Sequence, residues 1–222
     1  MKKILLSLLA LILMLVSTSA AFAFEKVNDK SVKITKVYRV TESGLKEVSL
    51  EEYLKAKADS KPVKKESSPI MDSKTTPQDI YSYYRYDESG SFLVRRTDLR
   101  TRVSRYVENR TSSSVSYTVS YSKTQGYELS TSLNSEEFSA LKSGVSFTWY
   151  DSASVSDSAT LTISPQHVGW WEFDPLMNKS WGYIKKVSTF GDILSSKYCT
   201  SYSPKKVNGM LDGYLIACEA PL

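Results

Sequence analysis

The stretch SVSYTVSYSKTQGYELSTS, residues Ser114–Ser132, alternates large apolar side chains with small hydroxyl side chains. From Val115 to Tyr121 every odd-numbered position is Val or Tyr, and every even-numbered position is Ser or Thr. A second stretch, GVSFTWYDSASVSDSATLTIS at Gly144–Ser164, repeats the pattern, and Pro165 ends it. An alternation with period two places successive side chains on opposite faces of a β-strand. Each stretch therefore predicts a strand with one apolar face and one hydroxyl face.

The segment between the two stretches predicts a capped turn. NSEEFSALK, Asn134–Lys142, has a residue that can cap a helix, and Glu137 follows it three positions later. We therefore expect the two strands to pair as one long antiparallel hairpin.

A symmetric turn would fix the register of this hairpin. Tyr121 then faces Asp157, and Lys123 lies diagonal to Asp157, where a cross-strand ion pair can form. Nearer the turn, the same register places two further pairs opposite each other, Tyr127 with Asp151 and Leu133 with Val145.

The length of the two stretches bears on the fold class. At about 3.3 Å per residue, each would extend about 65 Å, which is long for a domain of this size. The rest of the chain is also rich in strand patterns and poor in helix patterns. The predicted fold is mainly β: an elongated or strongly twisted antiparallel sheet with long strands, which bend where a bulge such as one at Gly126 allows. Further strands are expected at Tyr81–Tyr86, Phe92–Val107, Val168–Phe173, Trp181–Phe190, Lys197–Tyr202 and Leu211–Cys218.

The first residues predict export. Lys2 and Lys3 precede an apolar run from Ile4 to Val16, and Ala21–Ala23 forms an A-x-A cleavage site. This three-part layout is typical of a secretory signal peptide, residues 1–23, and predicts a secreted, extracellular protein. Its removal lowers the formal charge of +5 to +3, a mild value that does not favour nucleic acid as a partner.

The mature chain divides into three parts by composition. Residues 24–57 predict a small N-terminal module, with a hairpin at Ile34–Val48 and a short helix that opens at the capping box Ser49–Glu52. Residues 58–79 are rich in Lys, Ser and Pro and predict a linker. Residues 80–222 predict the antiparallel β domain. Cys199 and Cys218 are the chain's two cysteines, and export favours a disulfide between them.

The strand pattern resembles a known family. Asn109-Arg110-Thr111 opens the long alternating strands, and Gly169-Trp170-Trp171 follows the proline that ends them. Over roughly residues 80–190 this resembles aerolysin-type β-pore-forming proteins of the epsilon-toxin and mosquitocidal-toxin branch, and secreted bacterial β-proteins of the same pattern. The resemblance implies a protein secreted in soluble form that oligomerises and inserts a β-hairpin into a target membrane. It brings no catalytic residues.

The chain departs from that family in its hairpin and in its short length, which leaves little room for a receptor-binding domain. The inserting hairpin of the family is usually an extra element along the sheet, whereas here one long hairpin would serve either as sheet or as inserter. Lys123, Asp151 and Asp157 also interrupt its apolar face, and a soluble half-buried sheet produces the same alternation. The candidate amphipathic hairpin consists of Val115, Tyr117, Val119, Tyr121, Ala159, Leu161 and Ile163.

Two other groups of residues are candidate binding sites. The first group is a set of arginines at even-numbered positions, which could line one face of a strand: Arg96, Arg100 and Arg102. Such a face could bind anionic lipid, acidic glycan or another anionic polymer. Alternatively, it is a solvated face that is partly paired with Asp98 and Glu108. The second group could form an aromatic platform for sugar or membrane, and the adjacent tryptophans require either one exposed ring or burial on both faces. It consists of Trp170, Trp171, Trp181 and Tyr183.

The sequence does not indicate an enzyme. His167 is the sole histidine, no cluster of metal ligands is apparent, and no nucleophile motif occurs. No cofactor is expected. Two functions remain: an oligomerising, membrane-perforating β-protein, or a secreted cell-surface, glycan-binding or anionic-polymer-binding protein that forms no pore.

Overall fold

The structure is a computed structural model that describes residues 31–56, 58–59 and 81–222. Residues 33–222 form one compact unit. The predicted signal peptide and almost all of the predicted linker lie outside the described residues, so export and the domain boundaries stay predictions. Within the described part of the chain, no helix is long and apolar enough to cross a membrane.

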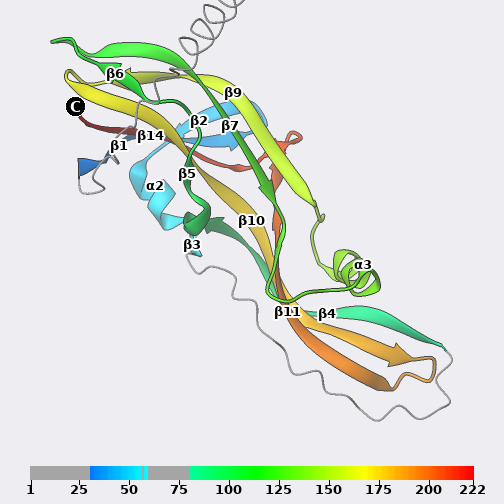
Figure 1. Cartoon of the computed structure of the whole chain (residues 1–222). Coiled ribbons are helices and arrows are strands. Elements are labelled where there is room, and N and C mark those ends of the chain that lie inside the picture. The colour runs from blue at the N-terminus through cyan, green and yellow to red at the C-terminus, as the bar shows by residue number, and fades with distance from the viewer. Residues whose placement is uncertain (1–30, 57, 60–80) are drawn as a thin grey trace, which may run out of the picture. The chain divides into compact units, whose positions relative to one another are not determined.

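The fold is mainly β, with long antiparallel strands, as predicted. Its central strand is β10, which runs without interruption from His167 to Ser188 (Figure 1). At about 3.3 Å per residue, its 22 residues extend about 70 Å. The strands that pair with β10 therefore set the positions of most other elements.

The partners of β10 change along its length. Its first part, as far as Pro175, pairs with β14 (Gly213–Pro221) on one side, and with β5 (Thr101–Arg102) and β6 (Val107–Asn109) on the other. From Leu176 onward it pairs with β4 (Ser82–Arg96) and β11 (Ile193–Pro204). Pro175 has no N–H to donate, and it lies where one set of partners ends and the other begins.

The N-terminal residues of the unit extend the same sheet. β1 (Lys33–Thr41) pairs with β14 and β2 (Gly44–Val48), which confirms the predicted hairpin. α2 (Leu50–Lys55) begins as predicted, because the Ser49 hydroxyl accepts a hydrogen bond from the Glu52 N–H at 3.0 Å. β3 (Ala58–Asp59) then pairs in parallel with the end of β4.

A second layer covers one face of this sheet. β7 (Val115–Gly126) and β9 (Ser152–Ile163) form a two-stranded sheet of their own, and Figure 1 shows it lying along β10 and β14. Between them come β8 (Glu128–Leu129) and α3 (Ser135–Gly144). β12 (Lys206–Val207) and β13 (Met210–Leu211) form a small hairpin. The main core lies between the two layers, where Trp171, Phe173 and Leu215 are fully buried.

Three predicted strand boundaries were wrong. The predicted break between Tyr86 and Phe92 is absent, because β4 keeps pairing with β10 on both sides of a bulge there. The predicted strand Phe92–Val107 is broken by a 3₁₀ turn, η2 (Thr97–Leu99). The predicted gap between Phe173 and Trp181 is absent, because β10 changes partners there without ending.

Candidate functional site

The β7–β9 hairpin is the candidate functional site. Its strands pair in register from Val115 opposite Ile163 to Gly126 opposite Ser152. Tyr121 lies opposite Asp157, as predicted, and the Tyr127 N–H donates to the Asp151 carbonyl at 3.1 Å. The predicted pairing of Leu133 with Val145 is wrong, because the register of β7 with β9 ends at Gly126 and Ser152, and the chain then pairs with β11 through β8 (Glu128–Leu129). The predicted capped turn is confirmed, since α3 carries a full capping box at Asn134 and Glu137.

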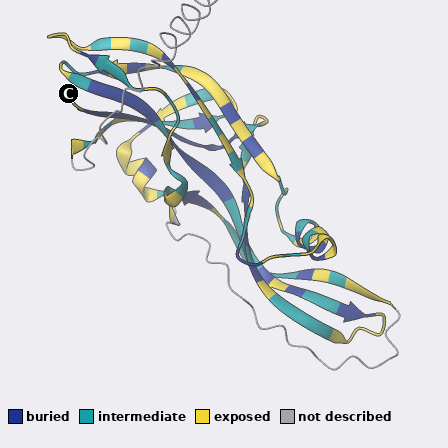
Figure 2. Ribbon diagram, in the orientation of Figure 1, coloured by how far each residue is buried: buried dark blue, intermediate teal, exposed yellow. Residues whose placement is uncertain are grey.

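The odd-numbered residues of the hairpin face the main sheet. Val119, Tyr121, Val155, Leu161 and Ile163 are buried, and Figure 2 shows the alternation of buried and exposed residues along both strands. They join Trp171, Phe173, Leu215 and Ala217 of the sheet in one hydrophobic cluster. The apolar face of the hairpin is therefore a core face in this form of the protein.

The even-numbered residues form a hydroxyl face that points to solvent. Each even-numbered residue of β7 and β9 is Ser or Thr, except Gly126, and each is exposed. Facing hydroxyls bond across the strands, at 2.9 Å between Ser116 and Thr162 and at 2.8 Å between Thr124 and Ser154. This face carries no formal charge.

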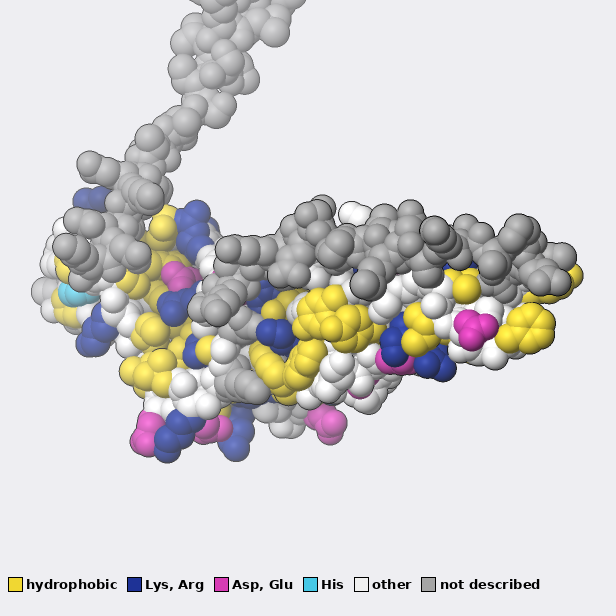
Figure 3. Space-filling model, turned by 90° about the horizontal axis from the view of Figure 1, so that it is seen from below, with side chains coloured by type: hydrophobic (Ala, Val, Ile, Leu, Met, Phe, Trp, Pro, Cys, Tyr) yellow, Lys and Arg dark blue, Asp and Glu magenta, His cyan; other side chains and the backbone are white. Residues whose placement is uncertain are grey.

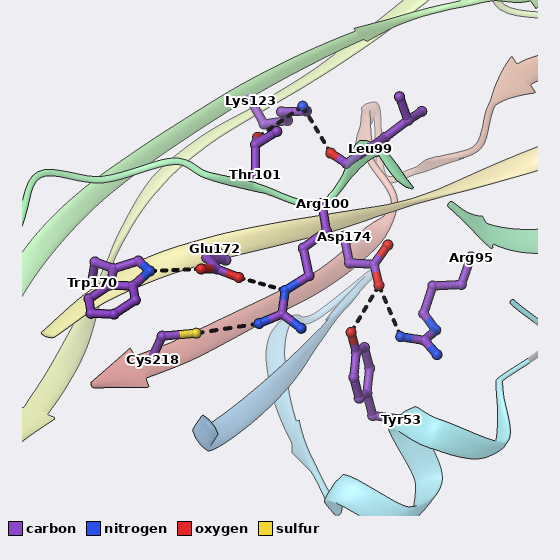
Figure 4. Close-up of polar contacts among 10 residues, drawn as sticks. All are labelled: Tyr53, Arg95, Leu99, Arg100, Thr101, Lys123, Trp170, Glu172, Asp174 and Cys218. Atoms are coloured by element: carbon purple, nitrogen blue, oxygen red, sulfur yellow. Dashed lines mark hydrogen bonds and ion pairs between the residues drawn. The ribbon is translucent and has the colours of Figure 1, made fainter. Parts of the chain in front are cut away.

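The middle of the hairpin has few polar links to the rest of the protein. The Ser122 N–H donates to the Val103 carbonyl at 3.2 Å. The ammonium of Lys123 donates to the Leu99 carbonyl at 3.4 Å and to the Thr101 hydroxyl at 3.2 Å (Figure 4). Burial lowers the pKa of Lys123. Among the described residues Lys123 forms no ion pair with Asp157, so the predicted diagonal pair is absent.

The open end of the hairpin is held by two buried polar side chains. The Asn109 side chain is fully buried, and its Nδ2 donates to the carbonyls of Ser113, Ile163 and Ser164 at 2.8, 2.9 and 3.0 Å. The Glu219 carboxylate accepts from the Ser164 N–H and hydroxyl at 3.2 and 3.1 Å. These contacts fix both chain segments at which the hairpin leaves the sheet.

The closed end of the hairpin is held by backbone pairing and by α3. β8 pairs with Ser201 and Tyr202 of β11, and the Glu137 carboxylate of α3 accepts from the Lys197 ammonium at 2.8 Å. Leu141 of α3 is buried against β4 and β10 residues. Rings also gather in this region, with centroids 5.0 to 6.5 Å apart: Tyr127, Phe138, Phe147 and Trp149.

The hairpin is thus an extra layer on a complete sheet, held at its two ends and packed in between. No family model matches the chain, and no curated protein matches it.

Solved structures also match the chain, and one of them can be described. It is a crystal structure described as "putative pore-forming toxin", from Bacteroides vulgatus ATCC 8482. The identity is 15% and the TM-score 0.24, and the match covers 64% of this chain and 55% of that chain. The chain therefore spans about half the length of that protein. Membership of the aerolysin-type family stays a prediction.

The three candidate arginines do not share an open face, so that prediction was wrong. Arg96 is only 1% exposed and contacts two carboxylates, Asp98 at 2.6 Å and Glu128 at 2.9 Å. Burial alone would lower the Arg96 pKa, but these two carboxylates raise it overall. Arg100 is paired with Glu172, whereas the exposed Arg102 lies over the Tyr106 ring. Arg96 therefore serves to bind Glu128, next to the closed end of the hairpin.

The predicted aromatic platform is not formed. Trp170 and Trp171 are both buried, one on each face of the sheet, which is the second of the two predicted outcomes. Trp181 is half-buried and packs against Phe92. It lies eleven residues further along β10, about 35 Å away, so Trp181 and Tyr183 cannot share a surface with the first two rings.

The predicted disulfide is also wrong, since Cys199 and Cys218 are free and buried. Cys199 lies opposite Gly182 on β10, and Cys218 lies opposite Trp170. These positions are twelve residues apart on one strand, or about 40 Å. A disulfide needs Cα atoms within about 7 Å. Burial raises the pKa of Cys199 to about 11 and that of Cys218 to about 12.

A buried ionic cluster that was not predicted from the sequence lies beneath α2. The Asp174 carboxylate accepts from the Tyr53 hydroxyl at 2.9 Å and from the Arg95 guanidinium at 3.0 Å (Figure 4). Burial raises the Asp174 pKa, although Tyr53 and Arg95 oppose that shift. The cluster ties α2 to the centre of β10. Asp174 interrupts a largely apolar stretch of the sequence, and this was the feature from which a buried ionic cluster could have been predicted.

The sole histidine contacts the backbone of its own turn. His167 Nδ1 lies 2.6 Å from the Pro165 carbonyl, and both residues belong to the open end of the hairpin. Within the described ranges no group of three metal-binding side chains occurs.

Proposed function

We propose that this chain is a secreted, non-enzymatic β-protein that perforates membranes by releasing the β7–β9 hairpin and inserting it into a lipid bilayer. The observation that carries the proposal is the separate pairing of this hairpin. Because β7 and β9 pair only with each other along their length, the hairpin can leave while the sheet around β10 keeps its own strand pairs.

The hairpin has the length and pattern that a membrane requires. A membrane-spanning strand needs about 9–11 residues, with apolar side chains towards lipid on alternate positions. β7 and β9 have 12 residues each. In the inserted state the odd-numbered residues would face lipid and the hydroxyl face would line the pore.

The energetics explain why release needs a membrane. Transfer into water of the five large buried side chains of the apolar face would cost about 10 kcal/mol. These are Val119, Tyr121, Val155, Leu161 and Ile163. In lipid the same side chains stay out of water, so most of that cost disappears. The hairpin therefore stays on the sheet in solution, and a bilayer lowers the cost of its release.

The two charges on the odd-numbered positions restrict the depth of insertion. Val115 and Lys123 are the ends of a nine-residue segment, so Lys123 reaches the headgroups when Val115 lies at the opposite surface. Asp157 lies two residue pairs from the Lys123 end of this segment. There the free-energy cost of an acidic side chain in the bilayer is lower than at mid-depth.

Insertion also requires several copies. A lone hairpin in lipid would leave the outer backbone N–H and C=O groups of β7 and β9 without partners, at several kcal/mol each. A closed ring of hairpins satisfies these groups, and the smallest such rings have about eight strands. We therefore propose a homo-oligomer of at least about four copies on the membrane.

The test compares two neighbouring lysine substitutions in dye release from liposomes. Ala159 lies opposite Val119 at the centre of the apolar face, whereas Ser158 lies on the exposed hydroxyl face. Ala159→Lys places a charge in lipid at mid-depth, at about 2–4 kcal/mol per copy, and should abolish release. Ser158→Lys should leave dye release unchanged.

Two results would reject the proposal. One is equal release by both variants, and the other is vesicle binding without release by the wild-type chain under every lipid composition. The second result would instead support a surface-binding protein that forms no pore.

A further inference from the structure

Exposed large apolar side chains concentrate at one end of the β4–β10–β11 sheet. Phe190 is 85% exposed and Tyr81 is 73% exposed, the highest values among the described large hydrophobic residues. Figure 3 shows hydrophobic side chains at this end of the unit, beside basic and acidic ones. We call this end the tip patch; its exposed members are Tyr81, Tyr83, Tyr183, Phe190, Ile193 and Tyr198.

The strand register brings these residues together. Val187 of β10 pairs with Tyr83 on one side and with Ile193 on the other, and Tyr183 pairs with Tyr198. The Tyr183 and Tyr198 rings meet edge to face at 5.3 Å. Tyr81 lies beside the same end of β10, because its carbonyl accepts a hydrogen bond from the Thr189 N–H.

Phe190 lies at the apex of the tip. It occupies the turn from β10 to β11, which is closed by a backbone bond from the Ser188 N–H to the Asp192 carbonyl at 2.9 Å. Glycine follows it, with a φ of +93°. The turn therefore holds the phenyl ring out at the end of the sheet.

Charged side chains adjoin these rings. The Asp87 carboxylate accepts from the Arg85 guanidinium at 2.8 Å and pairs with the Lys185 ammonium at 2.7 Å. With Lys186 of β10 and the exposed Asp192 of the apex turn, three cations and two carboxylates leave this end with one net positive charge. Tyrosines with an apolar ring and a polar hydroxyl, flanked by cations, are the side chains that proteins place at a membrane–water interface.

We infer that the tip patch docks this protein on the surface of a lipid bilayer that contains anionic headgroups. The apex of a single turn is convex and offers a narrow surface, whereas a stable protein interface needs about 800 Å² from each partner. A bilayer surface accepts a convex tip, because its apolar side chains need to enter only about 5–10 Å. The net positive charge complements anionic lipid.

Docking by the tip patch would also direct the closed end of the hairpin towards the bilayer. β8, next to the closed end of the hairpin, pairs with Ser201 and Tyr202 of β11, which lie eight and nine residues beyond Ile193. That separation is about 30 Å along the strand. Docking by the tip patch does not require insertion of the β7–β9 hairpin, so it stands apart from the proposed pore and is tested without it.

The experiment is flotation with vesicles of phosphatidylcholine and phosphatidylglycerol. Phe190→Ser and Tyr81→Ser should each weaken binding about tenfold, because each removes one ring from the interface. Leu54→Ser is the matched control: Leu54 is 62% exposed, but it lies on α2, away from the tip patch, and its loss should leave flotation unchanged. Thermal unfolding of each variant checks that the fold is kept.

Every result separates docking from pore formation. Flotation of Ala159→Lys at the wild-type level without dye release supports docking and leaves pore formation as a separate step. Docking is overturned if the wild-type chain does not float, if both tip variants float as the wild type does, or if Leu54→Ser is weakened as much as they are.

Discussion

Gly169 of β10 lies against Ile163 of β9 so closely that a Cβ atom on Gly169 would stand 2.8 Å from Ile163 Cγ1. The absence of a side chain at Gly169 thus lets the hairpin approach the sheet. We predict that Gly169→Ala forces Ile163 outward and lowers the free energy of unfolding by about 1–3 kcal/mol. Because the loss falls on the contact between hairpin and sheet, dye release should become faster.

Gly126→Ala is the control for this substitution. A Cβ atom at Gly126 would meet its nearest neighbour, the Asp151 carbonyl oxygen, at 3.8 Å, an ordinary contact. Chemical denaturation should show little change for Gly126→Ala. Equal stability and equal release rates for Gly169→Ala and the wild type would contradict the role of this contact.

Asn109 should be essential for the soluble form. Asn109→Ala removes a buried amide and leaves the Ile163 carbonyl without that donor, at a cost of about 1–3 kcal/mol. The neighbouring Arg110→Ala should change stability by less than about 0.5 kcal/mol, because the Arg110 side chain is 76% exposed. Urea unfolding of both variants measures the difference, and similar midpoints would show that Asn109 does not hold the hairpin.

The two cysteines should behave as protected thiols. A thiol reagent should label neither in the native protein at neutral pH and both in denaturant without reductant, because both are free and buried. No labelled site in denaturant without reductant, and two after reduction, would instead restore the disulfide.

The raised thiol pKa values also predict an alkaline loss of stability. An unfolded thiol ionises near pH 8.5, whereas the folded ones keep their protons until about pH 11 and 12. The stabilisation that they contribute is complete below pH 8.5 and is lost as the pH rises towards those values. Cys199→Ala with Cys218→Ala should therefore reduce the decline of stability between about pH 9 and 11, as measured by urea unfolding across that range.

The proposed pore should discriminate weakly between cations and anions. Its lining would be the Ser, Thr and Gly positions of β7 and β9, and ion selectivity usually depends on rings of charged side chains. In a salt gradient across a planar bilayer, we expect a reversal potential near zero. Ser158→Lys should shift the reversal potential towards the value of an anion-selective pore. A strongly selective wild-type pore would show that other residues form the lining.

The hairpin could be read from the sequence because its pattern is local. Period-two alternation placed Val119 and Leu161 on one face, and the capping box at Asn134 gave the turn and thereby the register of Tyr121 with Asp157. Fold class and the hairpin at Ile34–Val48 followed from the same kind of signal. These features depend on neighbouring residues only.

The long-range arrangement could not be predicted in this way. Nothing near Arg96 indicates that Glu128 pairs with it, and the spacing of Cys199 and Cys218 does not reveal that β10 separates them. The sequence predicted that a strand ends at Phe173, but β10 continues, and Pro175 lies where its partners change. The separate hairpin layer likewise depends on packing that no single stretch encodes.

A reversible lock on the hairpin tests the central claim most directly. Because a Cβ atom at residue 169 would lie 2.8 Å from Ile163 Cγ1, the pair Ile163→Cys and Gly169→Cys suits a disulfide between hairpin and sheet. Cys199→Ala and Cys218→Ala in the same chain exclude other pairings. We predict that the oxidised protein binds liposomes without releasing dye and that reductant restores release. Full release by the oxidised, locked protein would contradict the account.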